Sequence, residues 1–144
     1  MILHAGCVAR RGARGWAAVL ITGPSGAGKS DLALRLITRG WRLVADDRTR
    51  VWGSGGVLYA TAPEVLSGLV EARGLGICTL PPRWIAPVRL AAACLPPAQG
   101  AERLPDDAIA QFAGVRLPSI AVNALECSAE VKLELALARQ GREL

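Results

Sequence analysis

One eight-residue segment constrains this chain more than any other part of its sequence. It matches G-x-x-x-x-G-K-[ST] without a gap and consists of Gly23, Pro24, Ser25, Gly26, Ala27, Gly28, Lys29 and Ser30. Glycines let a backbone curl until successive N–H groups face one anion. In such a segment the lysine adds a positive charge for nucleotide phosphates, and the serine hydroxyl is a Mg²⁺ ligand. The segment therefore predicts a phosphate-binding loop.

The residues on both sides of this loop have the pattern that such a loop requires. Residues 19–22 form a short apolar run that ends in glycine, which predicts a buried strand. Residues 30–39 carry apolar side chains on one face, and Gly40 stands where a helix C-terminal glycine belongs. Residues 41–45 are typical of a second strand. Together they predict a strand–helix–strand unit, which disfavours a chance glycine-rich loop.

Two aspartates, Asp46 and Asp47, follow the second predicted strand. A right-handed crossover makes the two strands parallel, so their carboxyl ends lie along one edge of the sheet. We therefore expect both aspartates beside the glycine loop, where a carboxylate can accept a hydroxyl proton. The structural alternative is an aspartate pair that caps a turn before Arg48.

The rest of the chain predicts short strands, turns and one further helix. The length of 144 residues suits one domain, which we expect to span residues 1–144. Residues 10–15 predict an extended hairpin tip. The other expected elements are a hairpin over residues 51–60, a short helix over 63–69, a turn into a strand over 74–78, strands over 88–94 and 119–122, an exposed loop over 98–107 and a helix over 129–139.

Composition excludes several classes of protein. The net charge is +5, but the basic residues are spread along the chain and its six aromatic residues are not interleaved with them, so we expect no nucleic-acid binding. The longest uncharged stretch near the start, residues 15–28, is shorter than the roughly 18 apolar residues of a membrane span. The first residues also lack the pattern of a secretory signal. These features predict a cytoplasmic protein that does not enter a membrane.

The cysteines carry no metal signature. Cys7, Cys78, Cys94 and Cys127 show no C-x-x-C spacing, and His4 is the single histidine. Such a pattern predicts reduced thiols in packing positions rather than a structural zinc site.

A phosphate loop followed by paired aspartates is common to many kinases, and a further motif narrows the choice. The segment Glu71-Ala72-Arg73-Gly74-Leu75-Gly76-Ile77 resembles the E-x-R-G-x-G signature of the HPr kinase/phosphorylase family, in its C-terminal catalytic domain. Residues 20–30 and 39–48 are similar to the same family, and His4 resembles a histidine of its active site. The similarity covers most of residues 3–122 and is to the short form known among alphaproteobacteria.

The resemblance implies an α/β P-loop kinase domain of the HPr kinase and phosphoenolpyruvate carboxykinase-like type, with a mixed β-sheet and flanking helices. It implies an ATP-dependent serine kinase of the phosphocarrier HPr, which regulates carbon metabolism through the phosphotransferase system. The partner would be HPr or an HPr-like protein, and the family's members form homo-oligomers. Residues 121–127 lack the arginines of the P-V-R-P-G-R-N stretch that the family associates with dephosphorylation, so kinase activity is favoured over phosphorylase activity.

The resemblance also implies a role for each candidate residue. The glycine loop would bind ATP, with Lys29 on the phosphates. Ser30 and Glu71 would hold Mg²⁺. Asp47 would take the proton from the serine hydroxyl with support from Asp46, and His4 would be a further active-site residue. The arginines that steady the transferred phosphoryl group would be Arg73 and Arg103.

Two other functions remain open on the sequence alone. A small-metabolite kinase would use the same loop, although the β-rich middle of this chain offers no arginine-rich lid. A non-catalytic nucleotide-binding regulatory module would need Lys29 and Ser30 but neither Asp47 nor Glu71. A GTPase is disfavoured because Asn123 is the single asparagine, so no N-K-x-D motif exists.

Overall fold

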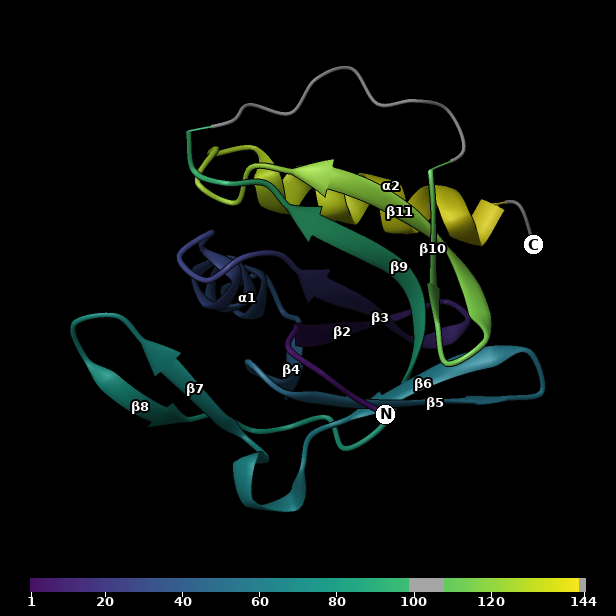
Figure 1. Ribbon diagram of the computed structural model, residues 1–144, viewed down its shortest axis with the longest axis horizontal. Helices are drawn as coiled ribbons and strands as arrows, with labels where there is room; N and C mark the ends of the chain where they lie inside the picture. Colours follow the sequence, from purple (N-terminus) through teal and green to yellow (C-terminus); the bar gives the residue numbers. More distant parts are fainter. Residues whose placement is uncertain (99–107, 143–144) are drawn as a thin grey trace.

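A curled mixed sheet with two helices against one face forms the body of the molecule (Figure 1). The computed structural model describes residues 1–98 and 108–142. The strands are β1 (Ile2–Leu3), β2 (Gly6–Gly12), β3 (Gly15–Thr22), β4 (Arg42–Ala45), β5 (Thr49–Ser54), β6 (Val57–Thr61), β9 (Ala86–Cys94), β10 (Ile109–Phe112) and β11 (Val115–Val122). The helices are α1 (Lys29–Thr38) and α2 (Ala129–Arg142). This architecture agrees with the mixed sheet and flanking helices expected from the sequence.

The order of the strands explains how distant residues meet at one edge. The main path is β1-β5-β6-β9-β3-β2-β4, and β11 pairs with β9 in parallel. β2 lies between β3 and β4 and is antiparallel to both. The two strands on either side of the loop and helix are therefore parallel, as expected, but they are not neighbours. The hairpin tip predicted over residues 10–15 is confirmed, because Gly12 pairs with Gly15.

Alternating side chains divide the core between the two faces of the sheet. In β3, Val19 and Ile21 face the helices, whereas Ala18 and Leu20 face the opposite side. The helices bury one stripe each, made of Leu32, Ala33 and Leu36 in α1 and of Ala129, Leu133 and Leu137 in α2. Full burial of one leucine contributes about 1.5–3 kcal/mol, so these stripes fix both helices on the sheet.

A separate hairpin projects beside this body (Figure 1). It consists of β7 (Leu69–Ala72) and β8 (Gly76–Thr79), joined to the sheet by a 3₁₀ turn, η1 (Glu64–Leu66). The prediction of a helix over residues 63–69 is wrong after Leu66, where the 3₁₀ turn ends. Gly68 adopts a φ of +76°, and its carbonyl accepts a hydrogen bond of 2.7 Å from the backbone N–H of Leu80. The chain therefore leaves the helical path and enters the hairpin.

The remaining expectations differ mainly at element ends. The hairpin over residues 51–60 is confirmed by the pairing of β5 with β6. The strands expected over 88–94 and 119–122 begin earlier, at Ala86 and Val115, and the last helix extends to Arg142. β10 was not expected. The loop expected over residues 98–107 lies outside the described residues apart from its first position. Within the described chain, no helix is long and apolar enough to span a membrane.

Candidate active site

The glycine loop joins the end of β3 to the start of α1. A Cβ atom at Gly23 would lie 2.6 Å from the backbone oxygen of Cys94 in β9, so no larger residue fits there. Gly28 precedes the helix with a φ of +91°, a conformation that L side chains rarely adopt. The N-terminus of α1, with its free backbone N–H groups and positive dipole end, thus opens at the loop.

Lys29 supplies the positive charge of this loop. Its Nζ donates hydrogen bonds to the carbonyl oxygens of Gly23 at 2.8 Å and of Pro24 at 2.9 Å. Among the described residues it forms no ion pair. The ammonium is therefore held against the loop while its charge is not neutralised by a carboxylate, as an anion-binding group requires.

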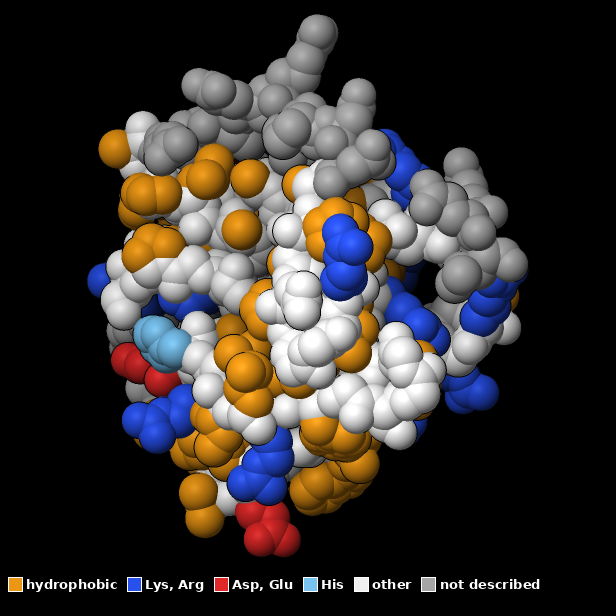
Figure 2. All heavy atoms as spheres, turned by 45° about the vertical axis from the view of Figure 1, so that its right-hand side comes forward, with side chains coloured by type: hydrophobic (Ala, Val, Ile, Leu, Met, Phe, Trp, Pro, Cys, Tyr) orange, Lys and Arg blue, Asp and Glu red, His pale blue; other side chains and the backbone are white. Residues whose placement is uncertain are grey.

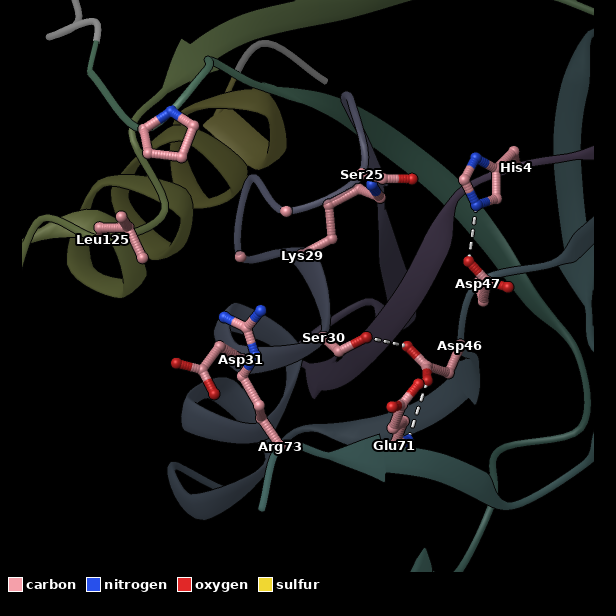
Figure 3. Close-up of a pocket in the computed structure, with 13 residues that line it drawn as sticks. His4, Ser25, Lys29, Ser30, Asp31, Asp46, Asp47, Glu71, Arg73 and Leu125 are labelled. Atoms are coloured by element: carbon pink, nitrogen blue, oxygen red, sulfur yellow. Dashed lines mark hydrogen bonds and ion pairs between the residues drawn. The ribbon is translucent and has the colours of Figure 1, made fainter. Parts of the chain in front are cut away.

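Asp46 connects the helix to the projecting hairpin. The Ser30 hydroxyl donates to Oδ1 of Asp46 at 2.7 Å, and the backbone N–H of Glu71 donates to Oδ2 at 3.1 Å (Figure 3). One carboxylate therefore fixes two candidate metal ligands from separate elements, α1 and β7. Since β7 lies outside the main sheet, this contact ties the hairpin to the edge of the cleft.

Asp47 points away from Asp46 and toward His4 (Figure 3). His4 Nε2 lies 2.7 Å from Asp47 Oδ1, and both side chains remain more than half exposed. Asp47 has a φ of +66°, which is unusual for a residue with a side chain. The turn before Arg48, which the sequence offered as the structural alternative, does form, because the Arg48 N–H donates a hydrogen bond to the Asp46 carbonyl. The two carboxylates also contact groups on other segments of the chain, so turn capping alone does not account for them.

These groups surround a cleft of about 460 Å³. Its lining consists of His4, Ser25, Gly26, Gly28, Lys29, Ser30, Asp31, Asp46, Asp47, Glu71, Arg73, Pro97 and Leu125. The structure therefore brings together most of the candidate residues. Gly23, Pro24 and Ala27 shape the loop without lining the cleft. Arg103 lies outside the described residues.

Arg73 stands in the turn between β7 and β8, and its side chain extends into the cleft (Figure 3). Sequence reasoning missed three lining residues: Asp31, Pro97 and Leu125. Asp31 is an acidic residue in the first turn of a predicted helix, a position that usually only stabilises the helix. Pro97 and Leu125 belong to no recognisable sequence motif. They reach the cleft because the ends of β9 and β11 pair with each other, which the sequence does not reveal.

The thiol of Cys94, which packs against Gly23 of the glycine loop, has low reactivity. Burial raises the pKa of Cys94 to about 11, although the charges of Lys29 and Arg35 partly oppose this shift. Burial also raises the pKa of Cys7. All four cysteines are free, as expected, but the prediction of packing positions is wrong for Cys127, which is exposed.

The oxygen atoms around Asp46 suit a magnesium ion that is shared with phosphates. Mg²⁺ uses one or two carboxylates together with waters and substrate phosphates, rather than a complete protein cage. The Ser30 hydroxyl and the carboxylates of Asp46 and Glu71 line the same cleft as the glycine loop. In the described part of the chain, no three or more His, Cys, Asp or Glu residues group as a metal site by themselves. The donor set fits Mg²⁺ bound with a nucleotide.

The fold and the glycine loop define the class as an α/β domain with a mixed sheet and a candidate phosphate-binding loop. Residues 15–82 match the family model described as HPr Serine kinase C-terminal domain. The solved structure of the Hpr(Ser) kinase/phosphatase from Coxiella burnetii aligns with a TM-score of 0.79 and 26% identity, over 99% of this chain and 96% of that one. The resemblance to the C-terminal domain of the HPr kinase/phosphorylase family, expected from the sequence, is confirmed.

Curated relatives are similar over a shorter segment. The HPr kinase/phosphorylase of Clostridium novyi is 54% identical over 63 residues, which is 44% of this chain and 20% of that protein. The one from Clostridium kluyveri is 58% identical over 59 residues, or 41% of this chain and 19% of that protein. The chain thus aligns with about a fifth of the length of these relatives. The match over residues 15–82 contains the glycine loop and both aspartates but not His4.

Proposed function

We propose that this chain is an ATP-dependent protein-serine kinase that phosphorylates HPr or an HPr-like phosphocarrier protein, with residues 1–144 as one catalytic domain. One observation carries the proposal: the carboxylate of Asp47, oriented by His4, lines the same cleft as Lys29 and the glycine loop. A proton acceptor and a phosphate-binding loop in one cleft are the two parts that a serine kinase needs.

Asp47 acts as the base in this proposal. A serine hydroxyl is a weak nucleophile, so its proton must pass to an acceptor as the oxygen attacks. The proton goes to Asp47, a bond forms between the serine oxygen and the γ-phosphorus, and the bond from the γ-phosphorus to the bridging oxygen of ADP breaks. His4 occupies Oδ1 of Asp47, which fixes the carboxylate and leaves Oδ2 to receive the proton.

The charge of the transferred group is balanced by the other cleft residues. Phosphoryl transfer depends on positioning and charge neutralisation more than on covalent chemistry. Lys29 and the loop N–H groups bind the phosphates, and Arg73 approaches from the hairpin. Ser30 and Glu71 would hold Mg²⁺, which neutralises phosphate charge when it is bound. We assign the same supporting role to Arg103.

The proposed direction is phosphorylation rather than dephosphorylation. Residues 121–127 form the end of β11 and the turn into α2, and Leu125 from this segment lines the cleft. The family's dephosphorylation stretch has arginines and a proline–glycine pair in the corresponding segment, and here they are absent. Without those cations the segment offers an apolar wall to the cleft.

We also propose that the protein forms a homo-oligomer. Leu75 and Ile77 on the β7–β8 hairpin are 81% and 74% exposed, and Val65 in η1 is 84% exposed. Large apolar side chains gathered on a projecting element are typical of protein interfaces. Light scattering on the purified chain tests this: a mass of 15.1 kDa at micromolar concentration would contradict it.

Incubation of the purified protein with Mg²⁺, γ-labelled ATP and HPr tests the proposed function. We expect an acid-stable phosphoserine on HPr, and no label on a control HPr whose serines are replaced by alanine. Tight ATP binding without transfer to HPr would contradict the proposal. Transfer to a small molecule in a metabolite extract would then indicate a metabolite kinase, and its absence would indicate a regulatory module.

A further inference from the structure

A second cavity lies at the end of the sheet opposite the active-site cleft. It has a volume of about 350 Å³, and its lining includes Arg10, Arg14, Trp16, Ala17, Arg89 and Leu137. It is bordered by the β2–β3 turn and the C-terminal half of α2. β3 begins at this cavity with Gly15 and ends next to the glycine loop, so the whole length of the strand separates the two sites.

The cavity is positively charged, and none of its lining residues in the described part of the chain carries a carboxylate. Arg14 and Arg89 form no ion pair with any described residue. Arg10 is partly engaged, since its Nη2 donates to the Glu134 carbonyl at 3.4 Å. In Figure 2, several basic side chains lie along the right-hand side of the molecule, and the acidic ones in view lie at the left edge and at the bottom.

A neighbouring hollow extends the basic surface. It has a volume of about 280 Å³, and Arg89 lines it together with Arg116. Arg89 therefore stands between two concave regions. Guanidinium groups that line the same concave surface repel each other, and an anion relieves that repulsion.

The floor of the 350 Å³ cavity is apolar. Ala17 and Leu137 belong to the core that packs between the sheet and the helices. Trp16 borders the cavity at the start of β3, but its ring packs with the core on the opposite face of the sheet, where the Arg83 guanidinium lies 4.7 Å from the ring centroid. Small-molecule sites combine such an apolar floor with a few charged groups, and their volumes begin at about 300 Å³.

We propose that this cavity binds a small organic anion that carries a phosphate or carboxylate group on an apolar or aromatic body. The guanidinium groups of Arg14 and Arg89 bind the anionic group, since arginine pairs with phosphate and carboxylate through two parallel hydrogen bonds. The body lies against Ala17 and Leu137. None of the residues that line this cavity lines the active-site cleft, so the site is independent of the proposed kinase activity.

Phenyl phosphate and benzoate are suitable probes, and the backbone N–H signal of Trp16 in a ¹H–¹⁵N spectrum is the readout. The Trp16→Phe variant assigns that signal. The titration uses a Lys29→Ala background, because a phosphate also binds the glycine loop. We expect both probes to shift the Trp16 signal but not that of Trp52, which stacks on Tyr59 in the β5–β6 hairpin. Benzyl alcohol, which lacks the charge, should produce no shift.

Charge removal tests the assigned residues. We expect the double variant Arg14→Gln, Arg89→Gln to bind phenyl phosphate about tenfold or more weakly. This factor corresponds to the loss of one or two charged hydrogen bonds. Arg42→Gln is the matched control, because Arg42 is exposed on β4 and does not line the cavity. Unchanged affinity in the double variant, or no Trp16 shift at millimolar probe, would overturn the proposal. Equal affinity for inorganic phosphate would overturn the role of the apolar floor.

Discussion

His4 Nε2 and Asp47 Oδ1 lie 2.7 Å apart although the two residues are separated by 43 positions in the sequence. The pairing of β2 with β4 brings them together, since His4 precedes one strand and Asp47 follows the other. The orientation of the proposed base therefore depends on an antiparallel strand pair rather than on a local motif.

Replacing His4 with glutamine should show whether His4 positions the Asp47 carboxylate or only stabilises the fold. The pair is exposed, so we expect the free energy of unfolding to change by less than about 1 kcal/mol. Phosphotransfer to HPr should fall by as much as about 10²-fold, because a displaced catalytic group loses its alignment. Urea unfolding and initial rates on the same preparation check both values. A large loss of stability with an unchanged rate would show that His4 is only structural.

Gly23→Ala should be more destabilising than Gly26→Ala. Both glycines have positive φ values, +139° and +80°, so each substitution strains the backbone. A Cβ at Gly23 also meets the Cys94 backbone oxygen at 2.6 Å, whereas nothing lies within 4 Å of one at Gly26. We expect losses of about 1–2 kcal/mol for Gly26→Ala and roughly 1–3 kcal/mol more for Gly23→Ala. Equal losses in chemical denaturation would contradict the close packing of the loop on β9.

Glu134→Gln should reduce the sensitivity of the fold to acid. The hydrogen bond from Arg39 lowers the pKa of Glu134, helped by the Trp41 indole, while burial opposes the shift. A lowered pKa means that Glu134 stabilises the fold above its unfolded pKa of about 4.5, and that this contribution is lost as pH falls through the folded value. Between roughly pH 5 and 3, wild type should lose more stability than Glu134→Gln. Parallel stability curves would contradict this account.

The cysteines should react in the order of their exposure. Cys94 is buried and its pKa is raised to about 11, so little thiolate exists there at pH 8. Cys127 is exposed. Mass spectrometry after brief treatment with iodoacetamide should find label on Cys127 and none on Cys94. Equal labelling of the two would mean that the strand beneath the glycine loop opens readily.

Contiguous motifs could be predicted from the sequence, and contacts between separate strands could not. The glycine loop, α1 and the two aspartates follow one another along the chain, so local patterns locate them. The insertion of β2 between β3 and β4 leaves no such signal, and the contact of Asp47 with His4 depends on it. His4 was a candidate only through family resemblance.

The β7–β8 hairpin shows the same limit. The motif that contains Glu71 and Arg73 was found by resemblance, and the turn into a strand predicted over residues 74–78 corresponds to β8. Its partner β7 was not predicted, because Gly68 redirects the chain after a helix-like start. The hydrogen bond from the Glu71 N–H to Asp46 joins residues 25 positions apart. The linkage of Trp41 to Glu134 spans 93 positions and likewise arises only when α2 packs on the sheet.

Single-turnover transfer from Mg-ATP to HPr, compared between wild type and Asp47→Asn, tests the central claim most directly. ATP affinity is measured on the same samples. If Asp47 is the base, the transfer rate falls by about 10²–10⁴ while the Kd for ATP stays nearly the same, because Lys29 and the glycine loop are intact. An Asp47→Asn protein that phosphorylates HPr at the wild-type rate would contradict the assignment.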